Sequence, residues 1–138
     1  MADSRAKIGV GLRIAAVVAV AFGLLTINEG GTVIFGGDAA RAAVGHYVPF
    51  VVWFNFLAGF AYVAAGVGLW RVRRWAAQLA AAIAVATVVV FVAFVMHVFA
   101  GGAYEARTVA AMTLRTVIWA AIAVYARRRR LRDAPPPA

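Results

Sequence analysis

The sequence predicts an all-α integral membrane protein, a bundle of four transmembrane helices that run antiparallel, up-down-up-down, with both termini in the cytoplasm. Composition is the first observation: 65% of the 138 residues are apolar, only 14% are charged, and the mean hydropathy is +0.89. Soluble domains average about 25% charged residues and could not bury this much apolar surface. The second observation is that the apolar residues form four runs, each near the ~20 residues that a helix needs to cross a bilayer.

The four predicted spans lie at about residues 8–30, 48–70, 75–99 and 107–126. Strands are excluded because alanine and leucine are abundant and no alternation with a period of two residues occurs. Pro49 suits the first turn of the second helix. Only residues 71–74 join the second and third spans, and a short segment containing Gly101 and Gly102 joins the third and fourth. Each of these pairs is therefore expected to form an antiparallel hairpin.

The first connection, at about residues 28–47, is the long one. Its glycine pairs at residues 30–31 and 36–37 leave open whether the first helix ends near residue 27 or continues to about residue 35. The chain as a whole is predicted to be one domain over residues 1–133. Residues 134–138, which contain three consecutive prolines, are predicted to form a short disordered tail.

Basic residues predict the orientation. They gather before the first span, between the second and third, and after the fourth: Arg5, Lys7, Arg13; Arg71, Arg73, Arg74; Arg127, Arg128, Arg129, Arg130 and Arg132. Since cytoplasmic flanks of membrane helices are rich in lysine and arginine, this pattern places both termini inside, in a plasma (inner) membrane of bacterial type. The net charge of +9 then indicates attraction to anionic lipid, with no nucleic-acid partner. A homo-oligomer or a larger membrane complex is the other expected association.

Polar residues within the spans are the functional candidates, because they are costly in a bilayer. At about 1.5 Å per residue, Glu29 and Asn55 both lie about 24 Å from the cytoplasmic arginines of their helices. By the same count Arg115 lies about 18 Å in, and its long side chain can cover the difference. We therefore expect a supporting polar layer in which Glu29 pairs with Arg115 and Asn55 bonds to one of them.

A second polar layer is predicted further out, at about 33–34 Å, where His97 ends the third span and Glu105 precedes the fourth. His46 and Tyr104 lie at the same mouth. Two imidazoles and two carboxylates can bind a divalent transition metal such as zinc, copper, iron or manganese. The predicted metal site is thus Glu29, His46, His97 and Glu105, with Asn55, Arg115 and Tyr104 in support. Haem on the two histidines ranks lower, because both lie near the surface.

Two functions remain open from the sequence. The first is binding of a metal ion or a small polar ligand at the polar cluster. The second is a non-catalytic assembly or scaffold role, with Arg115 as a bundle clamp and Asn55 as an interhelical hydrogen bond. An enzyme ranks third, since the single serine, Ser4, and the absence of cysteine and of HExxH, Walker A and GxSxG motifs leave no catalytic signature. In size and helix count the chain resembles small four-helix bacterial membrane families, DoxX-like ones included, a likeness that implies no activity.

Overall fold

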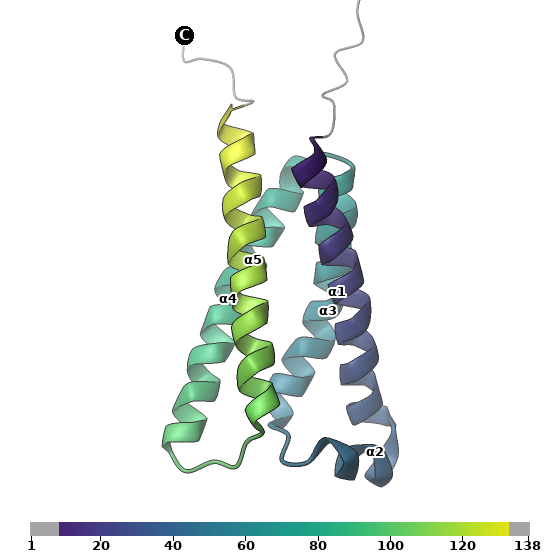
Figure 1. The fold of residues 1–138 in the computed structure, drawn as a ribbon, viewed down its shortest axis with the longest axis vertical. Coiled ribbons are helices and arrows are strands. Elements are labelled where there is room, and N and C mark those ends of the chain that lie inside the picture. Colours follow the sequence, from purple (N-terminus) through teal and green to yellow (C-terminus); the bar gives the residue numbers. More distant parts are fainter. Residues whose placement is uncertain (1–8, 133–138) are drawn as a thin grey trace, which may run out of the picture.

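The computed structural model describes residues 9–132, which form five α-helices and no strand (Figure 1). They are α1 (Val10–Phe35), α2 (Gly37–Val44), α3 (Pro49–Trp70), α4 (Arg74–Phe99) and α5 (Ala106–Arg132). All but α2 are long and apolar enough to cross a membrane. The predicted all-helical, four-span fold is confirmed. The predicted tail at residues 134–138, and with it Arg5 and Lys7, lies outside the described residues.

One helix takes the longer of its two predicted courses, and another extends beyond its predicted end. The first helix runs straight through the glycine pair at residues 30–31 and ends at Phe35, where the chain turns at Gly37, whose φ is +75°. The fourth span continues past residue 126 through its arginines, which are good helix formers.

Helix α2 was not predicted. Its Arg41 side chain donates to the carbonyls of Val33 and Ile34, at 3.3 and 3.1 Å, and so pairs carbonyl groups that the end of α1 leaves free.

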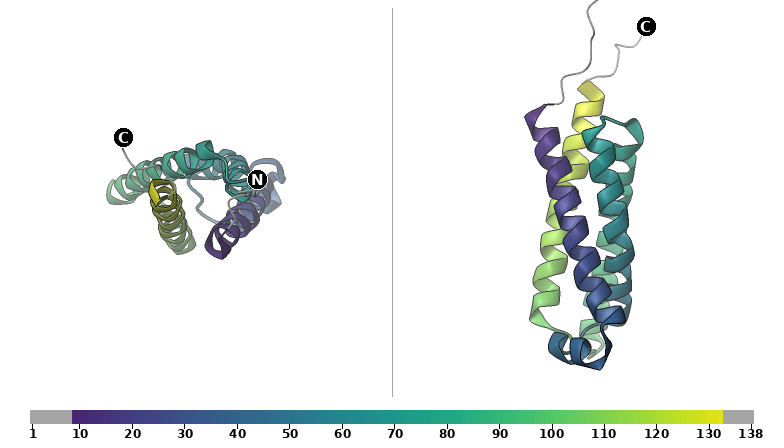
Figure 2. Two further views of the ribbon diagram at one scale, coloured as in Figure 1. Left: turned by 90° about the horizontal axis from the view of Figure 1, so that it is seen from above. Right: turned by 90° about the vertical axis from the view of Figure 1, so that its right-hand side faces the viewer.

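The four long helices form an open, curved row in the order α1, α3, α4, α5, with neighbours antiparallel (Figure 2). Helices α1 and α3 make the closest pair, because glycines let their backbones meet. A Cβ atom at Gly23 would lie 2.8 Å from the carbonyl oxygen of Gly59, and one at Gly66 would lie 2.9 Å from that of Ala16. Small residues allow this approach in lipid, where burial of large apolar side chains adds little.

Helices α1 and α5, at the two ends of the row, meet mainly near the chain termini, where the Tyr125 phenol lies against Gly11. Near the middle of α5 and α3, Trp119 and Tyr62 fill the interior, with their ring centroids 4.6 Å apart. Toward α2 the α1–α3 pair and the α4–α5 pair diverge (Figure 1). The divergence leaves room for a cavity in the half of the molecule nearest α2.

Candidate functional site

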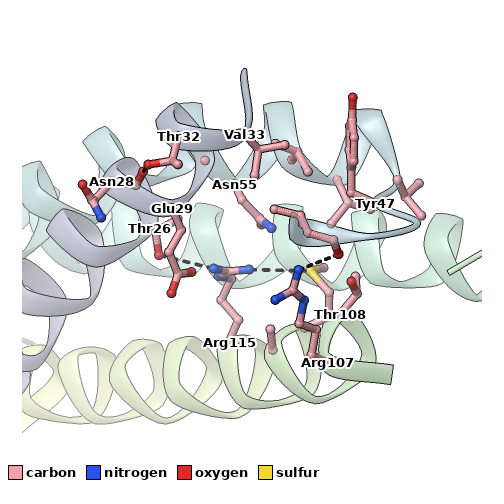
Figure 3. A pocket seen from close by; sticks show the side chains of 17 residues that line it. Thr26, Asn28, Glu29, Thr32, Val33, Tyr47, Asn55, Arg107, Thr108 and Arg115 are labelled. Atoms are coloured by element: carbon pink, nitrogen blue, oxygen red, sulfur yellow. Dashed lines mark hydrogen bonds between the residues drawn. The ribbon is translucent and has the colours of Figure 1, made fainter. Parts of the chain in front are cut away.

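A cavity of about 530 Å³ lies between α1, α3 and α5 in the diverging half of the molecule. The side chains of Glu29, Asn55, Arg107 and Arg115 converge on it from these three helices (Figure 3). Most of the remaining wall is apolar and includes Val33, Val48, Val51, Val52, Ala111 and Met112. Helix α4 contributes no lining residue. The three residues of the predicted polar layer thus surround one space.

Arg115 is the most buried polar group of the cavity after Thr26, with only 4% of its surface exposed. Its partners within residues 9–132 are neutral: Nη2 donates to the Thr26 hydroxyl at 3.3 Å, Nη1 lies 3.9 Å from the Met112 sulfur, and Cζ lies 5.4 Å from the Phe22 ring centroid. The Nε atom is buried without a hydrogen-bond partner in this part of the chain. A guanidinium with five donors is therefore left with weak acceptors at the wall of the cavity.

Glu29 and Arg115 form no direct ion pair, although the Glu29 charge lies near enough to act on the guanidinium. In the described chain no oxygen of Glu29 lies within 4.0 Å of a guanidinium nitrogen of Arg115, although its carboxylate faces the same side of α1 as Thr26 (Figure 3). Thr26, one helical turn earlier, takes the hydrogen bond. Glu29 stays exposed at the rim of the cavity. The Asn55 side chain reaches into the cavity from α3, and its Oδ1 is buried without a partner among the described residues.

The end of the cavity nearest α2 is closed by residues 44–48, which we call the strap. The backbone N–H of His46 donates to Glu105 Oε1 at 2.8 Å, and His46 Nδ1 lies 3.4 Å from the same oxygen. Arg107 donates to the carbonyl oxygen of Val44. The His46 N–H bond lowers the pKa of the Glu105 carboxyl from its ordinary value. Gly45, with φ +78°, brings the strap against this carboxylate, where a side chain would collide.

The other two residues of the predicted mouth lie at the turn between α4 and α5. His97 Nε2 is 3.2 Å from the carbonyl oxygen of Ala103, and its ring packs against Gly102. The Tyr104 ring meets Phe94 edge-on, with centroids 6.1 Å apart. Within residues 9–132 no three His, Asp or Glu side chains are grouped to hold a metal ion. The structure joins His46 to Glu105, and the four-residue metal site stays a prediction.

Several cavity residues were missed at the sequence level, among them Thr26, Arg107 and Met112. A signal for two of them was present, because Thr26 lies three residues before Glu29 and Met112 three residues before Arg115, a spacing that shares a helix face. No family model, curated protein or solved structure matches the chain. The site must therefore be interpreted from its own chemistry.

Proposed function

We propose that this small polytopic membrane protein binds a small ligand with an anionic group in the cavity between α1, α3 and α5. The observation that carries the proposal is Arg115, a buried guanidinium at the wall of an open space whose direct contacts within residues 9–132 are all neutral, with the Glu29 carboxylate more than 4.0 Å away. A buried charge is costly unless it is paired and hydrogen-bonded. A carboxylate or phosphate is the partner that the planar, five-donor guanidinium fits best.

Charge and size of the cavity support the same ligand. Arg107 and Arg115 contribute two positive charges to the lining and Glu29 contributes one negative charge, so an anion would balance the set. Asn55 adds a polar group aimed into the space. The volume of about 530 Å³ falls within the ~300–1,000 Å³ typical of small-molecule sites. Few polar groups in a mostly apolar wall are also typical of such sites.

The test is a thermal-unfolding assay of the full chain in dodecyl maltoside, with acetate, inorganic phosphate and decanoate as probes. We expect at least one anion to raise the unfolding temperature of the wild type in a saturable way. In Arg115→Met the shift should disappear, because the guanidinium is its main contact. In Gln78→Met, the same replacement residue at an exposed position on α4 away from the cavity, the shift should persist. The absence of a shift with every anion, or an equal shift in Arg115→Met, contradicts the proposal.

The orientation belongs to the same proposal: the cavity lies in the outer half of the bilayer. Exposed arginines at 71, 73 and 74 lie at the same end of the molecule as the start of α1 and the arginine-rich end of α5 (Figure 1). One cytoplasmic end for all three groups agrees with the positive-inside rule, in an inner or plasma membrane. The scaffold role stays a prediction, and stable co-purification of a larger complex would favour it.

A further inference from the structure

The cavity is closed at the end that faces the outer aqueous phase in the proposed orientation. The strap crosses it there and contributes Val44, Tyr47 and Val48 to the lining. Two contacts between residues far apart in the chain hold the strap to the start of α5: His46 N–H to Glu105, and Arg107 to Val44. A water-soluble ligand would have to break these contacts to enter from that side.

The opposite end of the cavity is closed by large side chains. One turn beyond Arg115, Trp119 is fully buried and packs on Tyr62, which in turn stacks on Phe22 with ring centroids 6.1 Å apart. The Phe22 ring also receives the Arg115 guanidinium. This aromatic layer separates the cavity from the end of the molecule that carries both termini.

The remaining side of the cavity lies between α1 and α5. These helices are the ends of the open row and do not pack along each other, so α3 forms the back wall and no described element forms the front (Figure 2). Ala111, a small and exposed residue of α5, lines the cavity at this side. Leu25 and Leu114, next in the chain to Thr26 and Arg115, are 60% and 54% exposed, as residues that face acyl chains are. The front of the cavity therefore opens toward lipid.

We propose that the ligand is an amphiphile taken from the membrane: its anionic head binds Arg115, and a single acyl chain leaves between α1 and α5 into the bilayer. The inference rests on the proposed function and names its ligand class. A polar head and an apolar chain match the two parts of the site, the guanidinium that reaches from α5 to Thr26 of α1 and the apolar walls that open toward lipid. Lateral entry also explains why the front alone lacks a covering element within residues 9–132.

The first test compares three probes that carry the anionic head, the acyl chain or both. Decanoate has both parts, acetate only the head, and 1-decanol only the chain. With the full chain in dodecyl maltoside, we expect decanoate to raise the unfolding temperature in a saturable way, and acetate and decanol to have at least about tenfold weaker apparent affinity. Ala111→Trp should weaken decanoate binding about tenfold or more by filling the opening. Ala110→Trp, at the exposed neighbouring position that does not line the cavity, should change it less than about twofold.

The second test locates the chain. A fatty acid with a photoreactive diazirine in its tail should form adducts on residues 25–32 of α1 and 107–115 of α5, with loss of these adducts in Arg115→Met. Equal affinity for acetate and decanoate, with both dependent on Arg115, would leave the anion site in place and overturn the amphiphile. Adducts spread evenly over α4 would do the same. Binding that is insensitive to Arg115→Met would remove the anion site itself.

Discussion

Replacement of Arg115 by methionine tests whether this residue acts as a structural ion-pair partner or as an unpaired charge at a binding site. An arginine at the centre of a membrane helix costs about 2.5–3.5 kcal/mol on insertion scales. Two contacts of Arg115 in this structure offset most of that cost. The bond to Thr26 is long, at 3.3 Å, and contributes about 1.5 kcal/mol, the low end for a charged donor. The contact with the Phe22 ring contributes about 1 kcal/mol.

Arg115→Met should therefore leave the free energy of unfolding unchanged or raise it by up to about 1 kcal/mol. The reason is that the insertion cost of the arginine slightly exceeds the stabilisation from its hydrogen bond and its ring contact. A paired arginine would behave differently, since removal of one partner of a buried pair costs about 3–5 kcal/mol. The assay is reversible unfolding in mixed micelles, on wild type, Arg115→Met, Glu29→Gln and the double variant. A loss of about 3 kcal/mol or more in Arg115→Met, relieved in the double variant, would refute the reasoning and restore the pair.

The remaining predictions concern the strap, the close α1–α3 contact at glycines (the glycine seam) and the orientation. Because the pKa of Glu105 is lowered, its hydrogen bond with the His46 N–H persists at neutral pH. The bond is lost only as the pH falls below the ordinary carboxyl pKa of 4.5 and through the lowered pKa of Glu105. The amide resonance of His46 in an NMR titration should follow this loss. Gly66→Ala should destabilise the protein by about 1–3 kcal/mol, measured by unfolding, because its Cβ would lie 2.6 Å from a Val20 methyl. In intact cells an impermeant thiol reagent should label Ala103→Cys and spare Val72→Cys, in a chain with no other cysteine.

Each of these three predictions has a control variant or an outcome that would contradict it. Gly31→Ala, whose Cβ would meet nothing closer than 3.4 Å among the described residues, should be neutral or stabilising, so an equal loss at both glycines would argue against the seam. Glu105→Gln should remove the step below pH 4.5 from the titration of the residue 46 amide resonance, and a step there that survives this change must come from another group. Labelling of residue 72 alone would invert the proposed orientation.

The spans could be predicted because membrane crossing depends on local composition. Length and hydropathy place all four long helices, and Pro49 begins α3 as expected. Helix α2 could not be predicted, because it owes its place to the tertiary bonds of Arg41 with the end of α1. Nor could composition indicate that the row of helices stays open between α1 and α5.

The site was predictable in depth but not in detail. Counting residues from the cytoplasmic arginines brings Glu29, Asn55 and Arg115 to one level, and all three line the cavity. The count gives no rotation about each helix axis. It therefore could not show that Arg115 bonds to Thr26 and not to the Glu29 carboxylate, which lies one helical turn further along α1. Likewise His97 and Glu105 share a level, but His97 bonds back to its own turn.

The divergence of the two helix pairs toward α2 gives the protein a tapered body, wider in one leaflet than in the other. A wedge of this kind displaces unequal areas of lipid in the two leaflets, so its energy depends on membrane curvature and on the lateral pressure of the acyl chains. Tight packing of the leaflet that holds the wide end would press α1 and α5 together, and a strongly bent membrane would relax them. The width of the opening would then change with the mechanical state of the bilayer.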